Sequence, residues 1–156
     1  MKKILFVCTG NTCRSPMAEA IFNQVISEKK LSASFMAKSA GISVIEGDIL
    51  SPKSAEICAE NGIAIESHSV CGVDETLLKA VSLTLTMTAD QRDALKKRYP
   101  QYSDKIYTLG EYAGSSCCSG DIPDPFGMPL QTYRKTYQIL DSYIRNLIEL
   151  LQEDEK

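Results

Sequence analysis

The sequence predicts an α/β fold: a single domain over residues 1–156, with a four-stranded parallel sheet and helices on both faces. The first observation is that short runs of apolar and β-branched residues alternate with longer segments whose apolar residues recur at helical spacing. This alternation is typical of parallel strands joined by crossover helices. The second observation is size, because 156 residues with 44% hydrophobic content suit one domain with its own core.

The first strand is expected over residues 3–8 and the first helix over 16–29. Pro16 suits the first position of this helix, which makes Ser15 the expected N-cap. Apolar residues share one face of the helix, at Met17, Ala20, Ile21 and Val25. A strand near 33–38 comes next along the chain.

A second helix is expected over residues 52–61, with Ser51 as its N-cap, a proline at its first position and an Asn-Gly pair at its end. The remaining elements are a helix at 74–80, a strand at 82–87, a helix at 89–98, a strand at 105–109 and a helix at 129–152. The last helix has one apolar stripe, made of Tyr133, Tyr137, Leu140, Ile144, Leu147 and Leu151.

The loop between the first strand and the first helix has the sequence VCTGNTCRSP, residues 7–16. Gly10 and Asn11 are the residue types that most easily adopt left-handed backbone angles, so the loop can turn its N–H groups inward as an anion-binding nest. Arg14 adds a planar fork for two phosphate oxygens, and a helix N-terminus follows directly. These groups would hold Cys8 as a thiolate that attacks phosphorus. The alternative is that Cys8 is a small buried hydrophobic residue in an ordinary turn.

A carboxyl group is needed to complete phosphate transfer, because the leaving group takes up a proton and the attacking water later loses one. Asp121 and Asp124 lie in the segment 120–129, whose three prolines and two glycines predict a stiff surface loop. Prolines on both sides restrict the backbone of Asp124, and Phe126 could wall a pocket. Aspartate also favours turns, and a turn-forming role is the favoured interpretation for Asp121.

These motifs, with Ser39-Ala40-Gly41 after the second strand, resemble those of the low-molecular-weight protein tyrosine phosphatase family in order along essentially the whole chain. The resemblance implies that Cys8 is the nucleophile, Arg14 binds phosphate and Asp124 is the general acid. The residues expected to contact substrate are Thr9, Gly10, Asn11, Thr12, Cys13 and Phe126. The resemblance also implies a polar network that supports the loop, formed by Asn11, Ser15, Ser39 and His68.

Residues 8–20 and 124–127 look like the bacterial protein arginine phosphatase branch of this family. Thr12 stands where many tyrosine phosphatases have a bulkier aliphatic residue, and its hydroxyl suits a polar, planar phosphoguanidinium group. The resemblance therefore favours a phosphatase that hydrolyses protein phosphoarginine through a phosphocysteine intermediate. Hydrolysis of protein phosphotyrosine is the alternative.

Two other functions stay open. A thioredoxin-linked arsenate reductase would need resolving cysteines, and the stretch 85–92 at the end of the third strand has none, so only Cys117 and Cys118 could serve. A phosphopeptide-binding module would use the nest without turnover. Cys13 could form a regulatory disulfide with an oxidised Cys8, or could simply pack in the core.

Composition limits the partners. Six cysteines without two paired clusters predict no structural metal site, and no cofactor is implied. A net charge of −3 argues against a nucleic-acid surface. We expect phosphorylated protein substrates, no nucleic acid and no membrane as partners, with a monomer as the default. The apolar run after Met1-Lys2-Lys3 is too short for a signal peptide, so a cytoplasmic location is expected.

Overall fold

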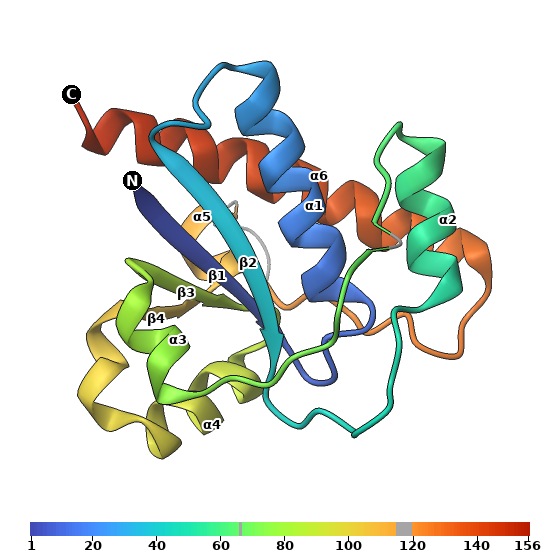
Figure 1. Cartoon of the computed structure of the whole chain (residues 1–156), viewed down its shortest axis with the longest axis horizontal. Coiled ribbons are helices and arrows are strands. Elements are labelled where there is room, and N and C mark those ends of the chain that lie inside the picture. The colour runs from blue at the N-terminus through green and yellow to red at the C-terminus, as the bar shows by residue number, and fades with distance from the viewer. Residues whose placement is uncertain (66, 115–119) are drawn as a thin grey trace.

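The computed structural model describes residues 1–65, 67–114 and 120–156 (Figure 1). Its strands pair in parallel as one four-stranded sheet in the order β2-β1-β3-β4, which confirms the predicted fold class. The strands are β1 (Lys2–Cys8), β2 (Phe35–Gly41), β3 (Leu83–Thr86) and β4 (Ile106–Thr108).

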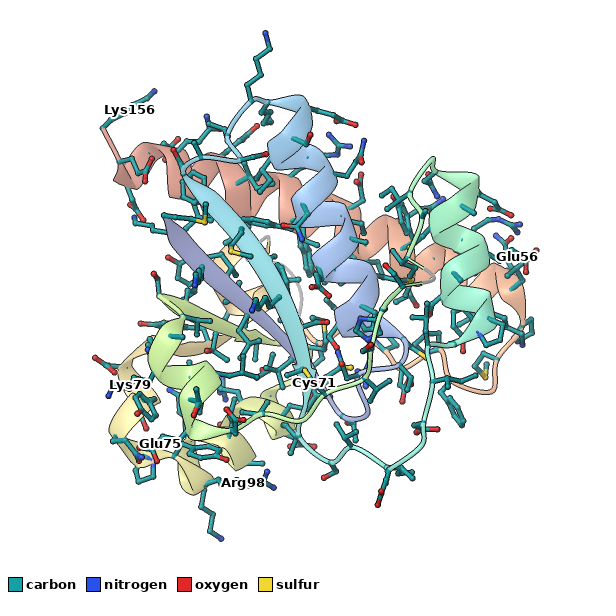
Figure 2. The ribbon with its side chains drawn as sticks, in the orientation of Figure 1. Glu56, Cys71, Glu75, Lys79, Arg98 and Lys156 are labelled. Carbon is teal, nitrogen blue, oxygen red and sulfur yellow. The ribbon has the colours of Figure 1, made fainter. Side chains whose placement is uncertain are left out.

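Helices cover both faces of the sheet, so β1 is buried on both sides. One face packs against α1 (Arg14–Glu28), α5 (Leu109–Ala113) and α6 (Leu130–Asp154), while α2 (Pro52–Glu60) packs against α1 and α6, away from the sheet (Figure 1). The other packs against α3 (Glu75–Ala80) and α4 (Ala89–Arg98), and a 3-10 turn, Pro100–Lys105, leads into β4. Alternate residues of β1 point to opposite faces, with Ile4 and Phe6 in the first core and Leu5 and Val7 in the second. Charged side chains such as those of Glu56, Lys79 and Arg98 lie on the outside (Figure 2).

Three local predictions differ from the structure. The second strand runs three residues further than expected, because its pairing with β1 continues in register as far as Cys8 and Gly41. Leu109 begins α5 instead of ending β4, because Thr108 and Glu111 form a capping box that was not predicted. The first helix begins at Arg14, with Cys13 at the N-cap position, so the prediction that Ser15 caps this helix is wrong.

The arrangement of the strands places three other segments beside the end of β1. Strands β2 and β3 lie on opposite sides of β1, so the strand order reverses at β1. In parallel α/β sheets such a reversal leaves a crevice at the carboxyl ends of the strands. The Ile42 N–H donates to the Cys8 carbonyl at 3.0 Å, and the Met87 N–H donates to the Val7 carbonyl at 3.0 Å. The Ile122 N–H in turn donates to the Met87 carbonyl at 2.9 Å, which brings the acid segment, residues 120–129, to the same place.

Among the residues that the structure describes, no helix combines the length and the apolar character needed to cross a membrane.

Candidate active site

Cys8 is the last residue of β1 and lies at the floor of the nucleophile loop, residues 8–15. Its side chain is 3% exposed, and its Sγ is 2.9 Å from the Ser15 hydroxyl oxygen. Ser15 lies in the first turn of α1, and its hydroxyl faces the loop instead of capping the helix. The predicted N-cap is therefore a partner of the candidate nucleophile.

Asn11 organises the loop from inside. It has the predicted left-handed backbone, with φ of 57°, whereas Gly10 is not among the glycines with positive φ. Its Oδ1 accepts from the Cys71 backbone N–H at 3.0 Å, which fixes the orientation of the amide. Its Nδ2 therefore faces the two serines, and donates to Ser15 Oγ at 2.8 Å and to Ser39 Oγ at 3.0 Å.

The network continues outward through a carboxylate that the sequence analysis did not single out. The Ser39 hydroxyl donates to Glu19 Oε2 at 2.8 Å. Burial raises the pKa of the Glu19 carboxyl, although the Ser39 hydrogen bond and the nearby His68 oppose this shift. The imidazole of His68 has Nδ1 3.7 Å from Glu19 Oε2 and Nε2 3.1 Å from the Asn11 carbonyl. A carbonyl only accepts, so Nε2 carries the proton and donates it to the loop.

Ser39 and His68 thus contact the nucleophile loop as expected. Their outer surface also lines a cavity of about 680 Å³ between α1 and the segment after residue 62. Cys71, labelled in Figure 2, lies on this side as well, next to the end of β2. The cavity is therefore behind the nucleophile loop and does not open onto the Cys8 sulfur, which is not among its lining atoms.

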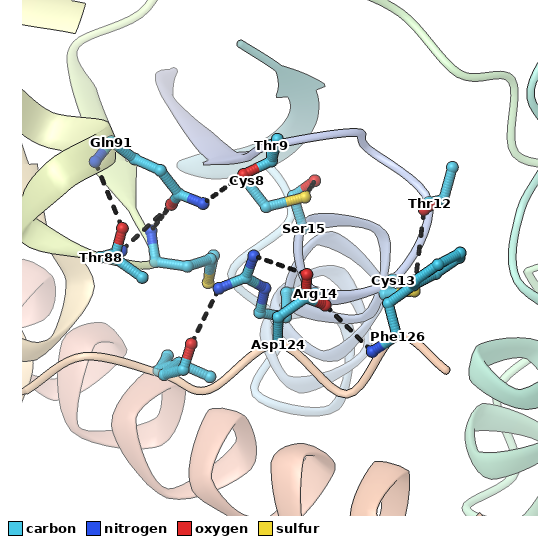
Figure 3. A network of polar contacts seen from close by, with 12 residues as sticks. Cys8, Thr9, Thr12, Cys13, Arg14, Ser15, Thr88, Gln91, Asp124 and Phe126 are labelled. Atoms are coloured by element: carbon cyan, nitrogen blue, oxygen red, sulfur yellow. Dashed lines mark hydrogen bonds and ion pairs between the residues drawn. The ribbon is translucent and has the colours of Figure 1, made fainter. Parts of the chain in front are cut away.

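Arg14 connects the nucleophile loop to the acid segment. Its side chain is 5% exposed, and Nη1 donates to the Ile122 carbonyl at 2.9 Å (Figure 3). Nη2 lies 3.6 Å from Asp124 Oδ2. The buried Nε has no hydrogen-bond partner among the described residues, so this guanidinium retains a donor suited to a phosphate oxygen.

Asp124 is much more exposed, with 52% of its side chain accessible. Its Oδ1 accepts from the Phe126 backbone N–H at 3.1 Å, an Asx turn that aims the other oxygen at Arg14. Phe126 is 73% exposed and lies at the solvent-facing side of the site. Asp121 caps a different element, because its Oδ1 accepts from Ala89 N–H, at the start of α4, at 2.9 Å.

A further loop residue, Cys13, contacts the long C-terminal helix. Cys13 Sγ lies 3.6 Å from the Tyr133 hydroxyl and 3.7 Å from the Thr12 hydroxyl. Sequence analysis placed Tyr133 only on the apolar stripe, but the Ser51 hydroxyl also donates to its oxygen at 3.3 Å. Burial raises the pKa of Tyr133, so the phenol stays protonated and available to this polar cluster near neutral pH.

The acid segment begins at a close backbone contact. A Cβ at Gly110, in α5, would overlap the carbonyl oxygen and Cα of Gly120, whose φ is 80°. Cys117 and Cys118, the residues on which the arsenate reductase alternative depends, lie outside the described residues.

Comparison with known proteins identifies the family. Residues 3–156 match the family described as low molecular weight phosphotyrosine protein phosphatase. The chain belongs to this family. It is 35% identical to the protein-arginine-phosphatase of Bacillus subtilis, over 98% of this chain and 99% of that protein. It is 39% identical to the low molecular weight protein-tyrosine-phosphatase PtpB of Staphylococcus haemolyticus, over 88% of this chain and 91% of that protein.

Solved structures of the family agree. A YwlE mutant from Bacillus subtilis has a TM-score of 0.90 with 34% identity, covering 97% of this chain and 99% of that chain. A YwlE arginine phosphatase mutant with a phosphorylated active-site serine has the same TM-score of 0.90 and identity of 34%, with 97% coverage of both chains. The low molecular weight protein tyrosine phosphatase from T. tengcongensis has a TM-score of 0.87 with 44% identity, covering 96% of this chain and 99% of that chain.

Proposed function

We propose that this member of the family hydrolyses protein phosphoarginine through a phosphocysteine intermediate. The observation that carries the proposal is the position of the Cys8 sulfur, 2.9 Å from the Ser15 hydroxyl, in a loop whose Arg14 also lies 3.6 Å from Asp124. The residues proposed as nucleophile, anion-binding group and proton donor thus lie close together near the end of one strand, which supports these roles.

In the first step the Cys8 thiolate attacks phosphorus and forms an S–P bond. The P–N bond breaks, and the Asp124 carboxylic acid gives its proton to the departing guanidine nitrogen. In the second step water attacks phosphorus, Asp124 takes up the proton of this water, and the S–P bond breaks to release phosphate. The donor-rich Arg14 side chain and the N–H groups of the loop would stabilise the charge on the transferred phosphoryl oxygens.

The serine network supports the thiolate. The Ser39 hydroxyl donates a hydrogen bond to the Glu19 carboxyl, and the Ser15 hydroxyl oxygen accepts one from the Asn11 amide. The Ser15 proton is therefore left for the Cys8 sulfur at 2.9 Å or for the Ala40 carbonyl at 3.4 Å. A hydroxyl that donates to sulfur favours the thiolate, both before attack and when Cys8 leaves.

Phosphoarginine is the favoured substrate because of Thr12. This side chain is half-buried in the nucleophile loop, and its hydroxyl gives the wall a polar group where an aliphatic side chain would be apolar. Asp124 could also pair with the cationic guanidinium while it donates its proton. Phosphotyrosine is the alternative, since relatives named as tyrosine phosphatases are as similar to this chain as those named as arginine phosphatases.

A paired assay tests the substrate. Phosphoarginine and phosphotyrosine peptides of matched sequence are compared by kcat/KM for the unaltered protein and for Thr12→Ile. We expect a preference for phosphoarginine that reverses in the variant. Equal rates, or a phosphotyrosine preference that Thr12→Ile leaves in place, would remove the phosphoarginine proposal.

The Cys8→Ser variant tests the chemistry. A hydroxyl is a far weaker nucleophile than a thiolate, so turnover should fall by about 10⁴-fold or more while inorganic phosphate still binds. Retained hydrolysis would assign the reaction to another group. A binding module without turnover would show no hydrolysis in the unaltered protein.

Three related expectations stay predictions. They are a cytoplasmic location, a regulatory disulfide between Cys8 and Cys13, and phosphorylated proteins as the physiological substrates.

A further inference from the structure

The first turn of α4 touches both halves of the site. Thr88 is the N-cap of this helix, and its Oγ1 accepts from the Gln91 N–H at 3.2 Å. The Gln91 side chain, only 7% exposed, returns to the turn, where Oε1 accepts from the N–H groups of Met87 at 2.9 Å and Thr88 at 3.1 Å. The carboxamide oxygen is therefore used entirely for the helix start.

The amide nitrogen of the same side chain makes a different contact. Gln91 Nε2 donates to the Thr9 hydroxyl at 3.0 Å, across 82 positions of sequence (Figure 3). Thr9 directly follows Cys8 in the nucleophile loop. An ordinary capping box needs no such bond, so the buried carboxamide links the helix start to the residue next to the candidate nucleophile.

The acid segment is fastened to the same turn from the other side. Asp121 Oδ1 accepts from Ala89 N–H at 2.9 Å, and the Ile122 N–H donates to the Met87 carbonyl at 2.9 Å. The Ile122 carbonyl accepts from Arg14 at 2.9 Å. These three bonds precede Asp124 by only two or three residues, and the proline between them allows little backbone adjustment.

We propose that Gln91 and Asp121 are positioning residues, which fix the nucleophile loop and the acid segment to one common support, the first turn of α4. Asp121 sets where the Asp124 carboxyl stands, and Gln91 sets where the strand end that bears Cys8 stands. Among the hydrogen bonds of the described residues, neither side chain bonds to Cys8 Sγ or to the Asp124 carboxyl. The inference rests on the proposed function, because it assigns positions to the two groups that the mechanism uses.

The two positions predict different kinetic defects. A displaced general acid slows a substrate more when its leaving group is more basic and needs a proton to depart. In the Asp121→Ala variant, kcat/KM should therefore fall by about 10-fold for phenyl phosphate and by under about 2-fold for p-nitrophenyl phosphate. Asp121→Asn keeps the Oδ1 acceptor and should restore the unaltered dependence on the leaving group. Gln91→Met removes the link to Thr9 and should lower kcat/KM by about 10-fold for both substrates, with weaker inhibition by inorganic phosphate.

A matched control separates positioning from helix capping. Asp74 caps α3 by accepting from the Leu77 N–H at 2.8 Å. Leu78 of this helix packs in the core on one face of the sheet, whereas Ile122 of the acid segment packs in the core on the other face. Asp74→Ala should lower Tm as the two test variants do, with kcat/KM unchanged for both aryl phosphates.

The outcomes distinguish the inference from the proposed function. Equal losses for the two aryl phosphates in Asp121→Ala, or failure of Asp121→Asn to restore the pattern, would overturn the inference alone. So would an unchanged kcat/KM in Gln91→Met. Absence of hydrolysis of both phosphoarginine peptides and aryl phosphates by the unaltered protein would overturn the proposed function, and the inference with it.

Discussion

The nucleophile loop and the acid segment form the two sides of the same site, but the protein holds them differently. Asn11 and Ser15 in the loop are fully buried, and each has side-chain hydrogen bonds to other buried groups. In the acid segment, Asp124 is 52% exposed and Phe126 is 73% exposed. The acid segment is fastened at Asp121 and Ile122, before its candidate acid. Within the part of the chain that the structure describes, the Asp124 carboxyl has one hydrogen bond, from the Phe126 N–H, and one ion pair, with Arg14.

This difference suits the two tasks of the proposed mechanism, which are binding of the phosphoryl anion by the loop and protonation of the leaving group by the acid segment. An anion is stabilised most when its donors are fixed in advance, because no energy is then spent on reorganising them during the reaction. A leaving group must depart from the other side, which requires an open and accessible surface. The comparison predicts that changes to the anion-binding groups of the loop affect both phosphate binding and turnover, whereas changes in the acid segment affect turnover alone.

Arg14→Lys should cause the largest loss after Cys8→Ser. Lysine has no planar fork, so it cannot reach the Ile122 carbonyl and also present two donors to phosphate. We expect kcat/KM for an aryl phosphate to fall by about 10³-fold, with a parallel loss of inhibition by inorganic phosphate. A loss below tenfold in both measurements would show that the loop amides alone hold the anion.

Asp124→Asn should have the next largest effect. The amide cannot donate an acidic proton, so kcat should fall by about 10²-fold, within the range usual for a general acid. The inhibition constant for inorganic phosphate should stay unchanged, because the acid segment is not part of the nest. If that constant shifts as much as kcat, the two sides do not act separately.

Asn11→Gly tests the hydrogen bonds of the loop without straining its backbone. Glycine adopts the φ of 57° freely, so this variant removes only the links from the amide to Ser15, Ser39 and Cys71. We expect a fall in kcat/KM of about 10-fold, which corresponds to about 1.4 kcal/mol, the size of one or two net hydrogen bonds. Asn11→Ala adds backbone strain and should be worse, and equal values for the two variants would contradict this separation.

Glu19→Gln should give the smallest effect, visible as a pH dependence of stability. Because the pKa of Glu19 is raised in the folded protein, its contribution to stability is full below its ordinary pKa and is lost as pH rises through the raised value. Glutamine does not ionise, so the Tm of the variant relative to that of the unaltered protein should be higher at pH 8 than at pH 4. Thermal unfolding at both pH values measures this difference, with the exposed Glu56→Gln as the control. A relative Tm that does not rise with pH would contradict the assignment.

The sequence predicted the part of the site that is contiguous. Cys8 and Arg14 lie on one loop, and the glycine, the asparagine and the helix that follows predict an anion-binding turn without any tertiary information. The position of both residues in one loop could therefore be predicted. The strand alternation likewise predicted the sheet, because each helix and strand has its own periodicity. Asp124 was found from its proline-rich surroundings together with the family resemblance.

The rest depends on tertiary contacts that no local pattern shows. Glu19 and Tyr133 read as ordinary helix positions, yet the fold brings them to Ser39 and Cys13. Only the N-cap prediction for Ser15 is wrong, because a serine before proline suits an N-cap equally well. Its contacts with Cys8 Sγ and Asn11 agree with the polar network that the family resemblance implied. The role of Gln91 was not foreseen, since its partner is 82 positions away.

The contact between Gly110 and Gly120 has a consequence for mutational surveys. Alanine at position 110 would be harmless on most short helices, but here its methyl group would have to push the start of the acid segment away. A screen scored on turnover would then mark this α5 residue as if it belonged to the reaction, although it lies on a helix that supplies no group to it. For substrates whose leaving group needs little protonation, such a variant should have a nearly normal rate of turnover.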